Sequence, residues 1–175
     1  MDLLKILICD GLDESGLELF RTAAGVQVDA PEGLSASEIK AVLPDYDAMI
    51  VRSRTKVTAD LIENAQRLKV VGRAGTGVDN IDVEAASARG ILVMNTPGAN
   101  AMAAAEHTLA MMLALARHIP QATDSMRKGL WEKKKFMGTE LYHQTIGIIG
   151  LGKIGAIVAD RALSMKMEVL VHDPH

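Results

Sequence analysis

The sequence has few aromatic residues, a single cysteine and no long uninterrupted apolar run. Two Phe, two Tyr and one Trp in 175 residues leave the hydrophobic core to be built from aliphatic side chains and ten Met. One cysteine excludes a disulfide framework. Because Cys9 lies in an apolar run, we expect it to be a small buried core residue rather than a reactive thiol. The absence of disulfides favours a reducing compartment, and we expect a cytoplasmic protein.

Neither charge nor hydropathy indicates a nucleic-acid or membrane partner. The net charge of −3 argues against general affinity for nucleic acid. The longest apolar stretch, residues 101–116, is interrupted by Glu106, His107 and Thr108. It falls short of the roughly 18 apolar residues that a membrane helix needs, so we expect a buried helix. No pair among the five His has metal-ligand spacing, and we expect no metal site.

Up to residue 97, short apolar runs alternate with amphipathic segments. This alternation predicts a parallel sheet covered on both faces, in a flavodoxin-like, doubly wound domain over residues 1–97. Ligands of such sheets bind beyond the carboxyl ends of the strands. The expected strands are 5–9, 26–29, 48–51, 68–72 and 91–94, the expected helices are 14–24, 82–88 and those capped by Ser35 and Thr58, and the loops at the ligand-binding edge are 52–56, 73–80 and 95–100.

Pro97 and Gly98 mark a boundary, and residues 98–175 form a second part. A long helix is expected over residues 100–118, where Pro120 breaks or restarts it, and a second helix continues to about residue 130. A basic segment with the sequence WEKKKFM follows at residues 131–137. The chain then returns to a strand, helix and strand pattern.

A glycine-rich turn stands between that strand and helix. Residues 145–149 run into Gly150-Leu151-Gly152-Lys153-Ile154-Gly155, the G-x-G-x-x-G pattern of dinucleotide sites. Gly150 allows a tight turn, Gly152 lets a pyrophosphate approach the backbone, and Gly155 lets the helix pack against the strand. The helix N-terminus offers N–H groups and partial positive charge to the phosphates. An ordinary strand–helix turn without a ligand is the alternative.

Asp173 ends the next strand and identifies the dinucleotide. A carboxylate at this position accepts a hydrogen bond from a ribose 2′-OH and repels a 2′-phosphate, so the pattern predicts NAD rather than NADP. Residues 145–173 therefore read as the first βαβ unit of a Rossmann domain, preceded by a hinge helix.

Five ordered blocks now carry a family resemblance: VRSRTKVTADLI, VGRAGTGVDNID, NTPGANAMAAAEHTLAMMLALAR, WEKKKFMGTEL and GIIGLGKIG. The chain resembles the N-terminal part of D-2-hydroxyacid dehydrogenases, and most of all the members that oxidise 3-phosphoglycerate in the first step of serine synthesis. One departure is His143-Gln144, where the family often has Gly-Lys, and we expect it to alter only a turn.

The resemblance implies that the first domain binds substrate and closes over a Rossmann domain, with hydride passing from C2 of the hydroxy acid to NAD. It assigns substrate binding to Arg52, Ser53, Arg73, Gly75, Thr76, Gly77, Asn100 and Lys133. It assigns cofactor binding to Thr76, Gly150, Gly152, Lys153, Ile154, Gly155 and Asp173. Independently, arginine forks suit a phosphorylated acid with about three negative charges. For Arg52, Arg54 and Arg73 the alternative is a solvated loop charge.

The basic segment resembles the family's dimer arm, and we expect a homo-oligomer formed through residues 100–140. A solvated charge run is the alternative for Lys133. The family's catalytic Arg, Glu and His would lie beyond residue 175, so we name no catalytic residue and expect no turnover by this chain alone. Two alternatives stay open: an autonomous folding or binding module from truncation, and a relative that acts on another D-2-hydroxy acid or senses redox state.

Overall fold

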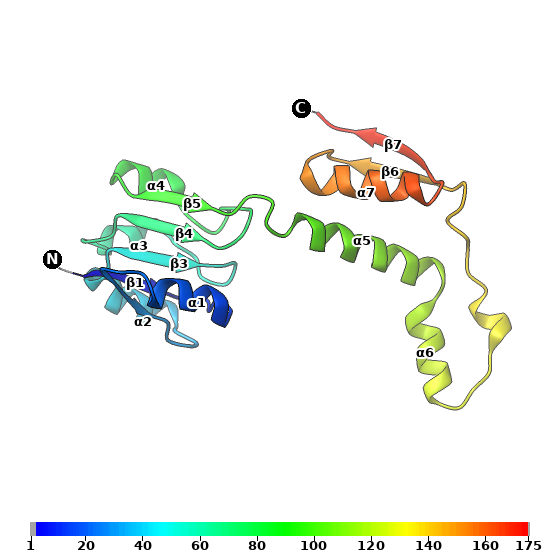
Figure 1. Ribbon diagram of the computed structural model, residues 1–175, viewed down its shortest axis with the longest axis horizontal. Coiled ribbons are helices and arrows are strands. Elements are labelled where there is room, and N and C mark those ends of the chain that lie inside the picture. The colour runs from blue at the N-terminus through cyan, green and yellow to red at the C-terminus, as the bar shows by residue number, and fades with distance from the viewer. Residues whose placement is uncertain (1–2, 175) are drawn as a thin grey trace. The chain divides into compact units, whose positions relative to one another are not determined.

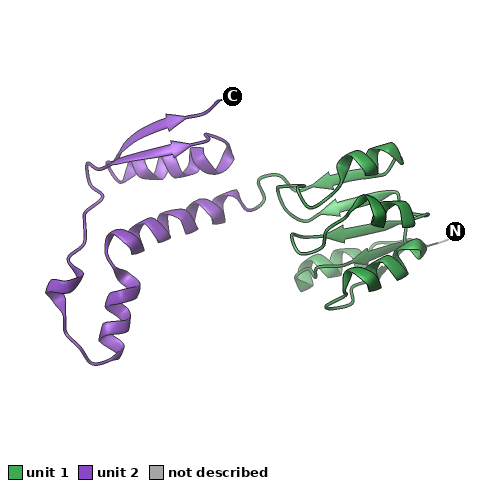
Figure 2. Cartoon of the chain, turned by 180° about the vertical axis from the view of Figure 1, so that it is seen from behind, with its two compact units in different colours: residues 1–99 green, residues 100–175 purple. Residues whose placement is uncertain are grey.

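The computed structural model describes residues 3–174, which form two compact units. The first unit ends at Ala99 and the second begins at Asn100 (Figure 2). This division lies close to the boundary expected at Pro97 and Gly98. Each unit has its own strands and helices, and each is described by itself.

The first unit is built on a five-stranded, wholly parallel sheet. Its strands follow the spatial order β2-β1-β3-β4-β5 (Figure 1). This is the flavodoxin-like order, so the predicted fold class is confirmed. The strands are β1 (Leu4–Ile8), β2 (Val26–Asp29), β3 (Ala48–Val51), β4 (Val70–Arg73) and β5 (Leu92–Asn95).

Capping side chains begin the helices of the first unit. Ser35 and Glu38 form the expected capping box, and the Thr58 hydroxyl accepts a hydrogen bond from the Leu61 N–H. Pro44 does not stop the second helix sharply, because the chain continues as a 3₁₀ turn. The first helix is shorter than expected and ends at Arg21. The helical elements are α1 (Glu14–Arg21), α2 (Ala36–Val42), η1 (Leu43–Asp45), α3 (Ala59–Asn64) and α4 (Val83–Ala88).

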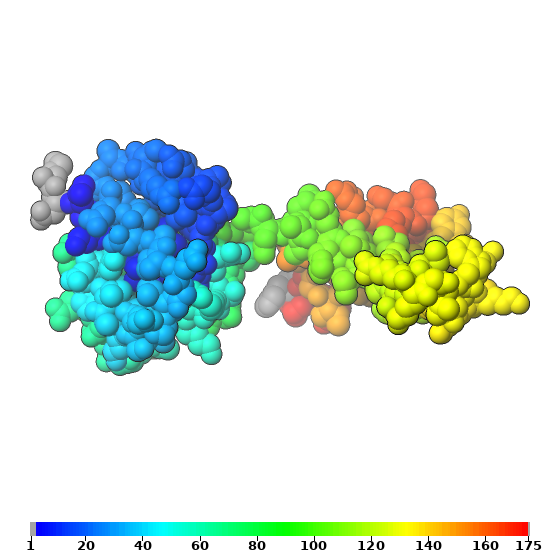
Figure 3. Space-filling model, turned by 90° about the horizontal axis from the view of Figure 1, so that it is seen from below, coloured from blue at the N-terminus to red at the C-terminus, as the bar shows by residue number. Residues whose placement is uncertain are grey.

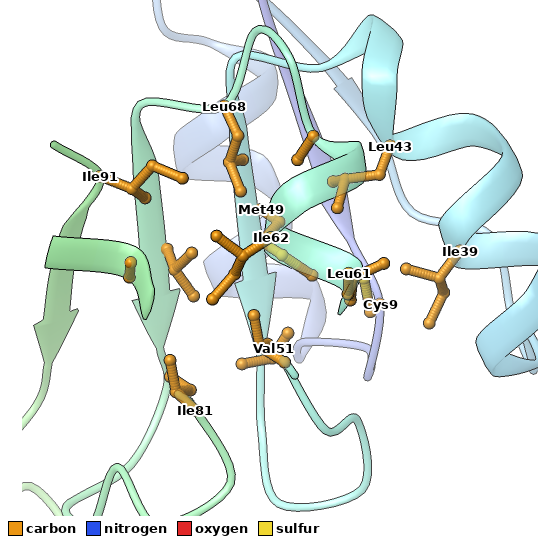
Figure 4. Packing of buried hydrophobic residues seen from close by; sticks show 14 of the residues in the cluster. Cys9, Ile39, Leu43, Met49, Val51, Leu61, Ile62, Leu68, Ile81 and Ile91 are labelled. Carbon is orange, nitrogen blue, oxygen red and sulfur yellow. The ribbon is translucent and has the colours of Figure 1, made fainter. Parts of the chain in front are cut away.

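The hydrophobic core lies between one face of this sheet and helices α2, α3 and α4. Its largest fully buried side chains include Leu43, Met49, Val51 and Ile62 (Figure 4). Cys9 is fully buried in the same cluster, as expected. The opposite face carries a groove of about 420 Å³. It is lined by residues of the sheet, by Leu12 just before α1 and by Phe20 on α1. The two faces of the sheet are therefore covered unequally.

The second unit pairs two parallel strands and packs helices beside them. β6 and β7 run parallel with Thr145 opposite Glu168, and α7 buries Val158 and Ala162. The strand, helix and strand pattern at the end of the sequence is thus present. The elements are α5 (Ala101–Ala116), α6 (Ile119–Arg127), η2 (Lys133–Phe136), β6 (Thr145–Ile149), α7 (Lys153–Ser164) and β7 (Glu168–His172).

The expectation that the long apolar helix is buried was wrong for most of α5. Only Ala101 and Ala105 are buried, whereas Met111 and Leu115 are 59% and 76% exposed. The apolar residues of α5 surround the helix, so its one packed side, against α7, leaves the others open. Among residues 3–174 no helix is long and apolar enough to cross a membrane.

The break between α5 and α6 differs in detail from the expectation. His118 adopts the left-handed conformation with φ of 55°, and Pro120 stands within the first turn of α6. Pro120 therefore restarts the chain as a helix after a turn that the preceding histidine makes.

α7 ends in a Schellman motif with a lysine where glycine is usual. The Met167 N–H donates to the Ala162 carbonyl (3.0 Å) and the Lys166 N–H to the Leu163 carbonyl (2.9 Å). Lys166 has φ of 62°, a conformation that is strained for any residue with a Cβ.

Replacing Lys166 with Gly should stabilise the second unit by about 0.5–1 kcal/mol, because glycine adopts this conformation without strain. Amide hydrogen exchange at Val158 and Ala162 measures the gain. Lys128→Gly is the control, since Lys128 also follows a helix but has φ of −83°, and it should give no stabilisation. Equal effects of the two variants would contradict the strain at Lys166.

Candidate functional site

The predicted substrate residues of the first unit gather at one edge of the sheet. β3 and β4 are neighbours with Val51 opposite Arg73, so the loops that follow them leave the sheet side by side. Parallel strands place their carboxyl ends at the same edge. Six of the predicted residues lie in these two loops or at the end of β4: Arg52, Ser53, Arg73, Gly75, Thr76 and Gly77.

Within this edge the two predicted arginines open onto different hollows. Arg52 and Ser53 line a cleft of about 880 Å³ with Asp10 and Gly33, at the ends of β1, β2 and β3. Arg73 lines the apolar groove beside α1. The structure therefore brings both arginines to one edge of the first unit, where Arg52 lines the cleft after β3 and Arg73 lines the apolar groove.

Asp10 organises the loop after β3. Its carboxylate accepts hydrogen bonds from the Arg52 N–H (2.6 Å), the Thr55 N–H (3.1 Å) and the Thr55 hydroxyl (2.6 Å). The side chain is only 3% exposed. Burial raises the pKa of the Asp10 carboxyl, but the hydrogen bonds from Thr55, Arg52 and Arg54 outweigh it, and the pKa lies below its ordinary value. Asp10 therefore stays ionised and holds the loop at neutral pH.

The neighbouring arginines of this loop have different partners. Arg54 Nε donates to Asp10 Oδ1 (3.1 Å) and its Nη2 donates to the Cys9 carbonyl (2.8 Å). The Arg52 guanidinium has no hydrogen-bond or ion-pair partner among residues 3–174, and the residue is exposed. Arg54 thus has a structural role, whereas the charge of Arg52 is available to an anion.

The loop after β4 brings the Arg73 side chain over a glycine. A Cβ on Gly75 would overlap the Arg73 guanidinium, so this position requires glycine if the arginine is to keep its place. A Cβ on Gly77 would lie 2.7 Å from Asp79 Oδ1. The Thr76 carbonyl accepts a hydrogen bond from Asn95 Nδ2 (2.6 Å), which ties the loop to the end of β5.

Two of the three glycines in the turn between β6 and α7 are required by the geometry of the chain itself, and the third leaves open space. Gly150 has φ of 92°, which favours glycine. A Cβ on Gly155 would overlap the Gly150 carbonyl oxygen, so the helix can approach the turn only at a glycine. A Cβ on Gly152 would meet no atom within 4 Å. Nothing in the described part of the chain requires glycine at 152, and the space beside it suits a ligand that approaches the backbone.

Asp173 lies at the mouth of the same turn. Its Oδ2 accepts a hydrogen bond from the Leu151 N–H, and the Gly150 N–H donates to the His172 carbonyl (2.8 Å). The end of β7 and the turn after β6 are thereby joined. The N-terminus of α7, with Lys153 and Ile154 exposed in its first turn, opens beside this carboxylate. A dinucleotide diphosphate and an adenosine ribose match this pairing of helix N-terminus and acid.

Two further predicted substrate residues belong to the second unit. Asn100 is the N-cap of α5 and Lys133 is the exposed first residue of η2, both in the second unit. Burial and the neighbouring Asp10 raise the pKa of the Cys9 thiol to about 12, so it is no nucleophile at neutral pH. Among the described residues no cluster of His, Cys, Asp and Glu could hold a metal ion.

Sequence reasoning missed two residues that hold the loop after β3, Asp10 through the loop's N–H groups and Asn80 through the loop's carbonyls. Asn80 Nδ2 donates to the carbonyls of Arg52 (2.7 Å) and Thr55 (2.6 Å). The position of Asp10 directly after a buried strand was a usable signal, because polar residues at the carboxyl ends of parallel strands face ligands or loops. Asn80 had no comparable signal in its loop.

Comparisons with known proteins agree with this fold. The family model described as "D-isomer specific 2-hydroxyacid dehydrogenase, catalytic domain" matches residues 6–165. A D-3-phosphoglycerate dehydrogenase of Synechocystis is 52% identical over 170 residues, which are 97% of this chain and 30% of that protein. The chain spans about a third of the length of the curated relatives it matches.

Solved structures of similar fold align over nearly all of this chain. A Thermus thermophilus protein aligns with a TM-score of 0.91 and 32% identity, over 98% of this chain and 57% of that one. An NAD⁺-bound 3-phosphoglycerate dehydrogenase of Entamoeba histolytica aligns with a TM-score of 0.80 and 32% identity, over 98% of this chain and 54% of that one.

The glycine turn predicts opposite outcomes for two alanine substitutions. Gly155→Ala should lower the free energy of unfolding of the second unit by about 1–3 kcal/mol, because the new Cβ must push the helix from the strand. Gly152→Ala should change it by less than about 0.5 kcal/mol, since its Cβ enters open space. Urea denaturation followed by circular dichroism compares them, and similar losses would contradict the described turn.

Proposed function

Because the chain belongs to the D-isomer-specific 2-hydroxyacid dehydrogenase family, we propose that it provides the substrate-binding unit and the first part of the cofactor site of an NAD-dependent D-3-phosphoglycerate dehydrogenase. Such an enzyme oxidises 3-phosphoglycerate to 3-phosphohydroxypyruvate, a step toward L-serine. The relatives at about half identity carry this name, which supports the choice of substrate.

The observation that carries the cofactor proposal is the open space beside Gly152, next to a helix N-terminus and an acid. NAD bound there would place its diphosphate against the first N–H groups of α7 and its adenosine ribose against Asp173. The chemistry that NAD supplies when bound is the acceptance of a hydride from the hydroxy acid. The residues of this chain bind and orient that group.

The substrate proposal rests on charge at the edge of the first unit. Arg52 lines the cleft after β3 with a guanidinium that has no partner among residues 3–174, and Arg73 lies at the end of the adjacent strand. Ser53 adds a hydroxyl beside Arg52 in the same cleft. Two arginines suit an acid that carries both a carboxylate and a phosphate, which favours 3-phosphoglycerate over glycerate.

Oxidation of the substrate needs catalytic side chains, and we do not assign these to this chain. By resemblance to the family, we propose that the catalytic Arg, Glu and His come from parts of the enzyme outside this chain. Among residues 3–174 the candidate site contains no histidine other than His172, whose carbonyl joins the glycine turn. We therefore propose that the 175-residue chain binds without oxidising its substrate.

Calorimetric titration with NAD tests the cofactor proposal. The chain should bind NAD with a dissociation constant below about 1 mM, and Gly152→Ala should weaken binding at least tenfold because its Cβ occupies the ligand's space. Gly147→Ala is the matched control, since its Cβ also meets no atom within 4 Å but lies in β6. Addition of 3-phosphoglycerate should produce no NADH absorbance.

The competing function is an autonomous folding or binding module. The complete sheet and core of the first unit favour it. No heat on titration with NAD would support that module and contradict the cofactor proposal, whereas turnover at the rate of a full-length relative would contradict the proposed inactivity.

We also propose that the chain forms a homo-oligomer through residues 100–140. Large apolar side chains of this segment are exposed, including Leu115, Trp131 and Met137 at 76%, 78% and 77%. The segment of α6 and η2 projects from the rest of its unit, as Figure 3 shows in yellow. An exposed apolar surface of this kind favours association with a like surface.

Sedimentation at micromolar concentration should find dimers or larger species. Leu115→Lys should shift the population toward monomer, because a charge replaces apolar area at the interface. Leu19→Lys is the control, since Leu19 on α1 is 74% exposed but lies outside the segment. A monomeric parent chain, or equal effects of both substitutions, would contradict the proposed interface.

A further inference from the structure

One side chain connects the two loops that carry the proposed substrate arginines. Asn80 ends the loop after β4, and its Nδ2 donates to the carbonyls of Arg52 (2.7 Å) and Thr55 (2.6 Å) in the loop after β3. Its Oδ1 accepts a long hydrogen bond from Arg73 Nε (3.5 Å). A single amide therefore contacts the backbone of Arg52 and the guanidinium of Arg73.

A second side chain, that of Asp10, also holds the loop after β3. The Asp10 carboxylate accepts hydrogen bonds from the N–H groups of Arg52 and Thr55. The Asn80 amide donates hydrogen bonds to the carbonyls of the same two residues. Both peptide groups of Arg52 are thus fixed, one through its N–H and one through its carbonyl. Because the backbone on both sides of the Cα is fixed, the direction in which the Arg52 side chain leaves the loop is fixed too.

We propose that Asn80 is a positioning residue for an anionic substrate. It holds the side chains of Arg52 and Arg73 at a fixed separation from each other. The proposal rests on the proposed function, in which Arg52 and Arg73 bind 3-phosphoglycerate. A ligand with two anionic ends needs its two cationic partners at a defined separation. Loss of the Asn80 amide frees the Arg52 carbonyl and the Arg73 guanidinium together.

The backbone separates this role from a general structural one. The Val57 N–H donates to the Asn80 carbonyl (2.8 Å), and the Asp82 N–H donates to the Val57 carbonyl (2.8 Å). Val57 and Ile81 form a parallel bridge and are both buried. These main-chain bonds join the two loops whatever the side chain at position 80. Removing the amide should therefore leave the loops attached and disturb the arginines.

The test titrates the 175-residue chain with 3-phosphoglycerate and follows the Nε–Hε NMR signals of Arg52 and Arg73. In the parent chain both signals should shift with one dissociation constant. In Asn80→Ala that constant should rise at least tenfold, and the two signals should stop moving together. Asn64→Ala is the matched control, because Asn64 Nδ2 also donates to a carbonyl, that of Lys40 (2.6 Å), away from the arginines. It should bind like the parent.

Each result decides the proposal. Parent-like binding by Asn80→Ala would overturn the role of Asn80 while leaving the proposed function intact. Arginine signals that stay still in the parent chain would contradict the substrate proposal itself, and the positioning role with it. If Asn80→Ala fails to fold, Asn80→Asp takes its place, because it keeps the size and the acceptor for Arg73 but has no N–H for the carbonyls. Parent-like binding by that variant would equally overturn the proposal.

Discussion

Both units of this chain are built from parallel strands, and parallel pairing limits where their loops can go. A parallel strand reaches its neighbour only through a crossover, so the loops that leave the carboxyl ends collect at one edge. In the first unit this edge receives the loops after β1, β3 and β4, and in the second it receives those after β6 and β7. Every residue that we propose to contact a ligand in these loops owes its place to that pairing.

The two edges then use different means to prepare for an anion. The second unit relies on missing side chains, since Gly155 lets α7 approach the turn and Gly152 leaves its N–H groups accessible. The first unit relies on ionised and amide groups, since Asp10 and Asn80 hold the backbone from which Arg52 projects. The glycine turn of the second unit suits a diphosphate bound by backbone N–H groups. The loops of the first unit suit an acid bound by arginine side chains.

Local patterns predicted the strands, the caps at Ser35 and Thr58, and the glycine turn, because each depends on residues close in the sequence. They did not predict the exposure of α5, since an apolar composition does not say which sides of a helix find a partner. They also missed Asn80, whose hydrogen bonds join residues 25 and 28 positions apart. Arg52 and Arg73 could be placed at one edge from the alternation of elements, but their separate hollows depend on side-chain packing.

The bridge between Val57 and Ile81 has a consequence for how such a protein can diverge. Since main-chain hydrogen bonds at Val57 join the two loops in addition to those of the Asn80 side chain, the amino acids at the loop tips carry little of the scaffold's integrity. Substitutions at positions 52 and 73 could thus change which carboxylic acid the protein binds as substrate, while the surrounding fold is kept. Related proteins that share this bridge would change substrate through a few loop substitutions, and the fold would tolerate each of them.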